Sequence, residues 1–211
     1  MNNPYLVVQD FEEAVAEYAG APYAVAVESC TSALLLAMKY YKVDEVVLPN
    51  KTYVGVAHSV LHAGGKCLFK DYKWTGAYRL EPYPIIDSAR RFKRNMYVPG
   101  TLYCNSFHWA KHIPIGRGGI ILTDDKDAYE WLKRARLDGR TEGVSPKEDN
   151  FDIPGYHAYM TPELAARGLM FMNINKNKDF DDLPEDGYVD LSKFPMFNDY
   201  ERPNYLNKDK Q

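Results

Sequence analysis

Short apolar runs alternate with segments of helical pattern between residues 23 and 139, and this alternation limits the folds that the chain can adopt. YAVAV at 23–27 precedes ESCTSALLLAMKYY at 28–41, and EVVLP at 45–49 precedes TYVGVAHSVLHAGG at 52–65. Further apolar runs are KCLFKD at 66–71, PIID at 84–87, TLYCNSF at 101–107 and GGIILTDD at 118–125, and KDAYEWLKRARLDG at 126–139 is helical in pattern. Strands that alternate with helices form parallel sheets covered on both faces. We therefore expect an α/β protein with three αβα layers and a mainly parallel sheet.

The two ends of the chain depart from this alternation. QDFEEAVAEYAG at 9–20 is amphipathic and predicts a helix that ends at Gly20. RTEGVSPKEDNFD at 140–152 is polar and rich in turn formers, which indicates a mobile loop. A second helix is expected at 161–175, with Thr161 as its N-cap and Pro162 at its first position. Beyond Asn175 the chain shows little periodicity, so we expect an extended tail that lies on the body of the protein or on a partner subunit.

Composition excludes several classes of protein. The 211 residues are 45% hydrophobic and 26% charged, with a net charge of -3, as in a soluble globular domain. That charge disfavours a nucleic-acid partner. No run approaches a membrane span, and the N-terminus lacks the basic start and apolar core of a signal peptide, so no membrane partner and a cytoplasmic location are expected. The three cysteines are far apart and form no CxxC pair, which argues against a disulfide framework or a zinc site.

Three polar segments follow different predicted strands, at the edge where open α/β sheets bind ligands. Ser29-Cys30-Thr31-Ser32 follows YAVAV and could hold a phosphate at a helix N-terminus, although these residue types taken alone are more often an ordinary helix cap. Asp87 ends PIID, where a carboxylate is costly unless it is paired; the neighbouring arginines 90 and 91 could supply a simple salt bridge. The third segment, from Ser106 to Lys111, follows TLYCN.

Lys111 could be a surface charge or a buried amine kept for chemistry. A desolvated lysine has a depressed pKa and can form a Schiff base with a carbonyl. Pyridoxal phosphate requires such an amine, an anion site for its phosphate, a carboxylate for its pyridine nitrogen and an aromatic face against its ring. Tyr53, which follows EVVLP, could be that face. The combination predicts pyridoxal phosphate as the cofactor.

With these residues, the sequence resembles the DegT/DnrJ-type sugar aminotransferases, which are pyridoxal-phosphate enzymes of fold type I. The family's serine-phenylalanine-histidine-x-x-lysine segment and Gly-Gly turn are matched by SFHWAK and GRGG. The resemblance implies that Lys111 is the Schiff-base lysine and that Ser106 is a phosphate ligand. The family's serine-glycine-threonine phosphate turn is matched by SCTSAL, with Cys30 in the place of glycine and Thr31 retained.

Further positions follow from the same resemblance. In IIDSARRF, Asp87 would pair with the pyridine nitrogen, and Arg90 stands where a glutamine or histidine approaches the ring hydroxyl. Tyr53 matches the aromatic residue that follows a proline-x-x-threonine turn. GYHAYMTPELAARGL is similar to the family's glycine-tyrosine-asparagine-tyrosine segment, where His157 replaces an asparagine that reaches the phosphate of the neighbouring subunit. Lys111 and Asp87 are therefore the expected catalytic residues.

The chain also departs from the family. A short link, YKWTGAYRLEPY, joins KCLFKD to PIID where relatives insert further elements, and a polar tail stands where relatives form a small domain. We expect a shortened cofactor-binding large domain at 1–145, with a loop, a helix and an irregular tail at 146–211 that replace the small domain. The implied function is transfer of an amino group from a donor such as glutamate to a nucleotide-linked keto sugar. The alternative is a degenerate pyridoxal-phosphate-binding paralogue with a binding or regulatory role and no transamination.

Three further hypotheses concern metals, nucleotides and assembly. His58 and His62, like His108 and His112, are four residues apart, but no acidic ligand stands at a recognised spacing, so ordinary core or surface histidines are expected and no metal. The basic run RRFKRN at 90–95 is typical of a solvated face, or could meet the diphosphate of a nucleotide substrate. The family's shared active sites imply a homodimer.

Overall fold

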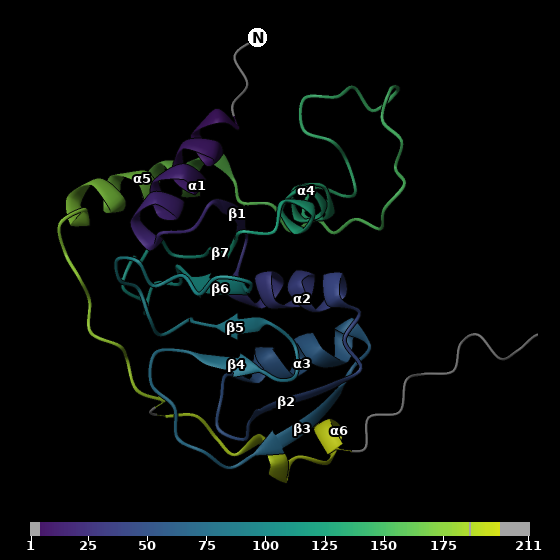
Figure 1. Ribbon diagram of the computed structural model, residues 1–211, viewed down its shortest axis with the longest axis vertical. Helices are drawn as coiled ribbons and strands as arrows, with labels where there is room; N and C mark the ends of the chain where they lie inside the picture. The colour runs from purple at the N-terminus through teal and green to yellow at the C-terminus, as the bar shows by residue number, and fades with distance from the viewer. Residues whose placement is uncertain (1–4, 186, 199–211) are drawn as a thin grey trace, which may run out of the picture.

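The structure, a computed structural model, describes residues 5–185 and 187–198, which form a five-stranded sheet, a separate two-stranded sheet and the helices that pack on them (Figure 1). The strands are β1 (Tyr23–Val27), β2 (Glu45–Pro49), β3 (Lys66–Lys70), β4 (Tyr78–Leu80), β5 (Ile85–Asp87), β6 (Leu102–Ser106) and β7 (Gly119–Thr123). The helices are α1 (Leu6–Ala19), α2 (Cys30–Tyr41), α3 (Val54–Ala63), α4 (Lys126–Ala135), α5 (Pro162–Asn175), the 3-10 turn η1 (Leu191–Lys193) and α6 (Pro195–Asn198). Every strand and every long helix expected from the sequence is present, and β4 is an addition inside the link at 72–83.

Strand pairing corrects the expectation of a mainly parallel sheet. The larger sheet has the order β1-β7-β6-β5-β4, and of its pairings only that of β5 with β6 is parallel. The reason is that β7 inserts between β1 and β6 and runs antiparallel to both, so β1, β5 and β6 still share one direction. β2 and β3 form a separate parallel pair, and an antiparallel bridge from Val47 to Glu81 links β2 to the chain beyond β4. The α/β class is confirmed, with a mixed sheet.

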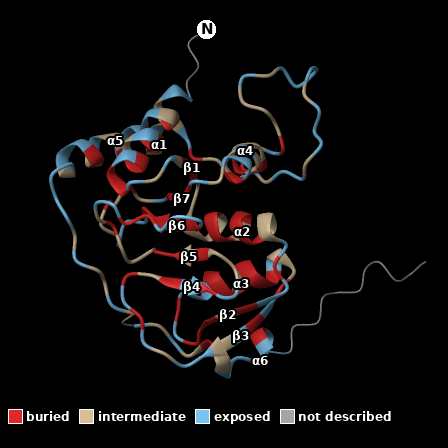
Figure 2. Cartoon of the chain, viewed as in Figure 1, coloured by how far each residue is buried: buried red, intermediate tan, exposed pale blue. Residues whose placement is uncertain are grey.

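The three layers follow from the alternation of side chains along the strands. On β1, Val25 and Val27 pack into a core shared with α2, α3 and α4, whereas Ala24 and Ala26 face a second core shared with α1 and α5. Side chains of β7 alternate in the same way: Ile121 packs in the first core, and Ile120 and Leu122 pack in the second. Buried residues accordingly lie along the strands and on the sheet-facing sides of the helices (Figure 2). The expected three-layer arrangement is present.

The helix ends agree with the sequence signals. Gly20 ends α1 in the left-handed conformation, at φ 76°, and Ser29 caps α2 by accepting a hydrogen bond from the backbone N–H of Ser32. Thr161 and Pro162 stand at the start of α5 as expected, although the Thr161 side chain makes no capping hydrogen bond there. The polar segment at 140–152 carries neither helix nor strand and is mostly exposed.

The tail beyond Asn175 packs on the body of its own chain, which is one of the two placements expected for it. Leu191 and Phe197 are buried in the core that α2 and α3 share. α5 packs against α1, so the residues beyond 145 add to both cores, and the division of the chain at residue 145 stays a prediction. Within the described ranges, no helix combines the length and apolarity that a membrane crossing requires, and the cytoplasmic location stays a prediction.

Candidate active site

A pocket of about 300 Å³ opens where the carboxyl ends of several strands meet at one edge of the fold. β1 leads into the turn at 29–31, β2 into Thr52 and Tyr53, β5 ends at Asp87, and β6 ends at Ser106. These strands share one direction, which brings their following residues together. All the predicted site residues except His157 line the pocket: Cys30, Thr31, Tyr53, Asp87, Arg90, Ser106 and Lys111.

Asp87 lies at the base of this pocket and is only 4% exposed. Its Oδ1 accepts a hydrogen bond from the backbone N–H of Ala89 at 3.0 Å, and its Oδ2 accepts one from the Tyr78 hydroxyl at 2.7 Å. Thr52 Oγ1 lies 2.6 Å from the same Tyr78 oxygen, which completes a buried chain of three polar groups. Burial raises the pKa of the Asp87 carboxyl, while the bond from Tyr78, the bond from Ala89 and the charge of Lys111 oppose that rise. No arginine pairs with Asp87, so the simple salt bridge is not formed in the described structure.

Lys111 occupies the loop after β6 and is partly buried. Burial lowers the pKa of its ammonium group, and the Arg90 guanidinium lowers it further, whereas Asp87 and Cys30 act in the opposite direction. Its backbone N–H donates to the carbonyl of His108 at 2.9 Å, which folds the loop so that residues 108, 110 and 111 all line the pocket. A lysine in this setting supplies a neutral amine at lower pH than a surface lysine does.

The N-terminus of α2 forms another wall. Ser29 caps the helix, and Cys30, Thr31 and Ser106 contribute to the pocket lining beside it. A Cβ atom on Gly119 would lie 2.4 Å from the Ser29 carbonyl carbon, so glycine allows β7 to approach this turn. Unpaired N–H groups and hydroxyls at a helix start favour an anion. Burial raises the pKa of the Cys30 thiol well above its ordinary value, which keeps that side chain neutral.

Tyr53 and Arg90 stand at the sides of the pocket. Tyr53 is 54% exposed, directly precedes α3 and lines the pocket. Arg90 donates from Nη1 to the hydroxyl of Tyr188 at 3.2 Å, and its guanidinium carbon lies 5.4 Å from the centre of that ring. The Nε of Arg90 is buried and has no hydrogen-bond partner among the residues that the structure describes.

Sequence reasoning missed several lining residues, chiefly Trp74 and Tyr188, as well as Tyr78 behind the pocket. Trp74 and Tyr78 belong to the link YKWTGAYRLEPY, whose density of aromatic residues was an available signal. Tyr188 belongs to the tail, where no periodicity marks it. His108 also lines the pocket; the sequence placed it in the SFHWAK motif and in a histidine pair but assigned it no role in the site.

His157 lies outside the pocket of its own chain. Its Nδ1 is 2.9 Å from the carboxylate of Asp138, and its side chain is 72% exposed. The role expected for it concerns the pocket of a neighbouring subunit and stays a prediction.

The histidine pairs have ordinary surroundings. The rings of His58 and His62 lie 6.0 Å apart, and His58 packs edge-on against Phe197. His112 contacts the backbone oxygen of Asp181 through Nε2. In the described part of the chain, no group of three or more His, Cys, Asp or Glu side chains is arranged to hold a metal ion.

Sequence comparison supplies the decisive observation. The sequence profile of the DegT/DnrJ/EryC1/StrS aminotransferase family matches residues 2–82 and 98–176. The chain belongs to this family. The resemblance found in the motifs is thereby confirmed, and the matched ranges include every predicted site residue except Asp87 and Arg90.

Individual relatives agree with this assignment. UDP-4-amino-4,6-dideoxy-N-acetyl-beta-L-altrosamine transaminase from Campylobacter jejuni is 41% identical over 208 residues, covering 77% of this chain and 55% of the relative. AtS13 from Actinomadura melliaura has a similar structure, with a TM-score of 0.70 at 21% identity over 82% of this chain and 61% of that protein. Spr1654 from Streptococcus pneumoniae, solved in a PLP form, has a TM-score of 0.66 at 18% identity over 79% of this chain and 59% of its own.

The chain spans about half the length of the curated relatives that it matches. Membership of this aminotransferase family and the PLP form of a structural relative support pyridoxal phosphate as the cofactor, as the sequence predicted. The pocket fits that group, because it offers an amine, a buried carboxylate and hydroxyls at a helix start. The reading as a degenerate paralogue without transamination gains no support from these comparisons.

Proposed function

We propose that this chain binds pyridoxal phosphate in the pocket and transfers an amino group from an amino acid donor such as glutamate to a nucleotide-linked keto sugar. The observation that carries the proposal is the meeting of Lys111, Asp87, Thr31 and Ser106 around one cavity of about 300 Å³. The family match and the name of the Campylobacter transaminase support transamination and a nucleotide-linked sugar as the acceptor.

When bound, pyridoxal phosphate accepts an amino group and withdraws electrons from the carbon that carries it. Asp87 holds a proton at the ring nitrogen, for which its carboxylate must be ionised; the hydrogen bonds from Tyr78 and Ala89 favour that form. Ser106, Thr31 and the start of α2 bind the phosphate, and the Tyr53 ring covers one face of the cofactor. Each of these residues orients the cofactor relative to Lys111.

Lys111 has two tasks in this proposal. Its amine would hold the cofactor in the resting enzyme, and once free it would move a proton at the substrate carbon. Both tasks need the neutral amine for part of the cycle. Partial burial and the charge of Arg90 lower the pKa of Lys111, which raises the neutral fraction at physiological pH.

We further propose that the protein acts as a homodimer. His157 lies outside its own pocket with a 72% exposed side chain, and Trp109, 70% exposed, lies on the loop that carries Lys111. In a dimer both surfaces are available to a second copy of the chain. Light scattering after size exclusion measures the mass directly, and a monomer at micromolar concentration would contradict this part of the proposal.

The test of the reaction is the visible absorption spectrum of the protein with added pyridoxal phosphate, before and after glutamate. We expect a band in the wild type that glutamate converts, and no such band in Lys111→Ala. Lys126→Ala is the matched control, because that lysine is exposed on α4 with a 71% exposed side chain. A lysine-dependent band that no amino donor changes would support the binding paralogue instead, and the absence of any lysine-dependent band would refute cofactor attachment at Lys111.

A further inference from the structure

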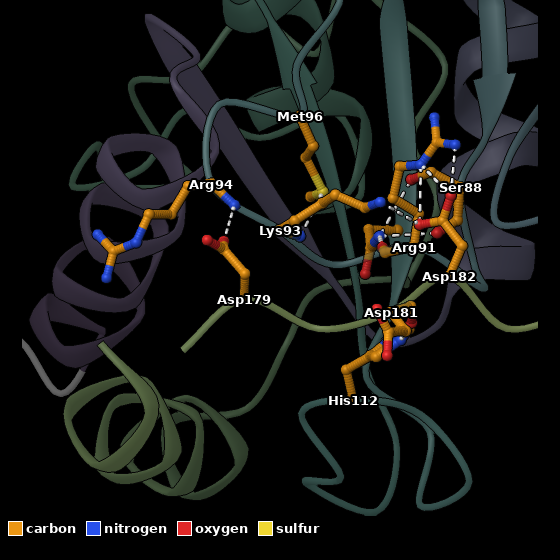
Figure 3. A network of polar contacts seen from close by, with 10 residues as sticks. Ser88, Arg91, Lys93, Arg94, Met96, His112, Asp179, Asp181 and Asp182 are labelled. Carbon is orange, nitrogen blue, oxygen red and sulfur yellow. Dashed lines mark hydrogen bonds and ion pairs between the residues drawn. The ribbon is translucent and has the colours of Figure 1, made fainter. Parts of the chain in front are cut away.

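The C-terminal segment, defined here as residues 176–185 and 187–198, crosses the rim of the pocket. Its aspartates Asp179 and Asp182 contact the basic run at 90–95 (Figure 3). Asp182 pairs with Arg91 at 2.6 Å and with Lys93 at 3.0 Å, and Asp179 accepts a hydrogen bond from the backbone N–H of Arg94 at 3.0 Å. Arg91 and Lys93 are therefore both paired with one carboxylate of the chain's own tail, and Arg90 is the member of the run that lines the pocket.

Backbone hydrogen bonds hold the segment at two further places. The N–H of Leu183 donates to the carbonyl of Arg90 at 2.9 Å, and its carbonyl accepts from Gly76 at 3.0 Å. Beyond the pocket, the N–H of Leu191 donates to the carbonyl of Asn50 at 2.8 Å, and the Leu191 side chain is 1% exposed. The segment thus joins the loop after β5 to the loop after β2 and is fixed on both sides of the pocket.

Tyr188 lies between these two anchors and enters the pocket wall. Its ring stacks on Trp74 at a centroid distance of 6.1 Å and an interplanar angle of 17°. Trp74 is itself fixed, since its Nε1 donates to the carbonyl of Lys51 at 2.9 Å. The Tyr188 hydroxyl also accepts a hydrogen bond from Arg90, and the guanidinium of Arg90 lies over the Tyr188 ring. Within the described residues, the guanidinium of Arg90 is held by its hydrogen bond and its cation–π contact with Tyr188.

We propose that Tyr188 is a positioning residue of the active site, which acts through Arg90 by holding its guanidinium in the pocket beside Lys111. The C-terminal segment is then a structural part of the site, because its two anchors determine where Tyr188 lies. A guanidinium held in this way recognises an anionic oxygen of the bound group. The ligand part of this inference rests on the function proposed above, whereas the placement of Arg90 rests on the contacts of the chain alone.

The first readout therefore needs no cofactor. The groups that act on Lys111 are Arg90, Asp87 from β5, Cys30 from α2 and the adjacent His112. Trace acetylation of the apo protein across a pH series, with peptide mass spectrometry, gives the pH at which the Lys111 amine becomes reactive. We expect Tyr188→Ala to move that midpoint upward, because a displaced Arg90 no longer disfavours the lysine charge. Arg90→Met should move it in the same direction.

A double-mutant cycle distinguishes a Tyr188 that positions Arg90 from a Tyr188 that only shields the pocket from solvent. If Tyr188 acts through Arg90, the Tyr188→Ala shift should be much smaller in the Arg90→Met background than in the wild type. Tyr72→Ala is the matched control, since Tyr72 is a half-buried tyrosine that does not line the pocket, and it should leave the midpoint unchanged. An equal Tyr188→Ala shift in both backgrounds, or none in the wild type, would overturn the proposal.

The second readout is the dissociation constant of pyridoxal phosphate. Tyr188→Ala should weaken binding roughly threefold to tenfold through loss of a charge-assisted hydrogen bond and a cation–π contact, and Tyr188→Phe should weaken it less. Asp182→Asn, which removes the charge that pairs with Arg91 and Lys93 next to the Leu183 anchor, should act in the same direction, whereas the exposed Glu130→Gln should not. A wild type that binds no cofactor would refute the proposed function but leave the acetylation result to decide the role of Tyr188.

Discussion

Replacement of Asp87 tests separately what its buried carboxylate costs in folding free energy and what it contributes to the proposed reaction. Asp87→Asn keeps the shape of the side chain and removes its charge. The amide oxygen can still accept from Ala89, and the amide NH₂ can donate to the Tyr78 oxygen, whose own hydroxyl then donates to Thr52 at 2.6 Å. The buried chain of polar groups stays fully hydrogen-bonded with its direction reversed. We therefore expect the unfolding free energy of apo Asp87→Asn to lie within about 1 kcal/mol of the wild type.

Asp87→Ala is the matched contrast, because it removes the acceptors as well as the charge. Tyr78 can still turn to Thr52, but the Ala89 N–H is left without the acceptor that it has in the wild type. A half-buried donor left without its acceptor and a small cavity together cost about 2–4 kcal/mol. Urea unfolding of both variants, with unchanged m-values, measures the difference. Equal destabilisation by Asn and Ala would refute the reversed hydrogen-bond chain.

The pH dependence gives a second check on the same residue. Burial raises the native pKa of Asp87 above its ordinary 3.8, so the folded state keeps this proton at a pH where the unfolded state has lost it. The ionised carboxylate destabilises the apo protein above its native pKa, and this penalty disappears as pH falls through that value. Any stability advantage of Asp87→Asn should therefore shrink on acidification. In the donor-conversion assay, the role proposed for Asp87 predicts that both variants lose activity by about 10²-fold or more, because neither side chain could keep the ring nitrogen protonated.

Two further predictions concern the framework around the site. Glu12 accepts a hydrogen bond from the Ala26 backbone N–H at 2.7 Å and pairs with the buried Arg136, so Glu12→Gln should lower the unfolding free energy by about 2–4 kcal/mol. In the same urea titration, replacement of the exposed neighbour, Glu13→Gln, should change it by less than about 0.5 kcal/mol. Gly119→Ala should destabilise the protein by about 1–3 kcal/mol and weaken pyridoxal-phosphate binding, because the new Cβ would push the start of α2 away from β7. Unchanged affinity in a fluorescence titration would contradict the proposed binding of the phosphate at the start of α2.

Local sequence signals located most of the fold and of the site for one physical reason. Helix caps such as Ser29 and Gly20 act within a few residues, and a polar residue directly after an apolar strand lies at the ligand-binding edge wherever the strand sits in the sheet. The direction of β7 has no such local signature. GIILT is buried at every position, so the run has the same pattern whether it pairs parallel or antiparallel with its neighbours.

The aromatic wall was beyond reach for a different reason. Trp74 and Tyr188 are far apart in sequence, and their stacking depends on the path of the tail across the pocket. The charges along that path are visible in the sequence, however, since the basic run at 90–95 and the aspartates between residues 179 and 182 are opposite in charge. Each run on its own is typical of a solvated face, and it is their pairing that carries Tyr188 to Arg90. In a chain that spans about half of its curated relatives, a tail without periodicity therefore still supplies part of the wall of the candidate site.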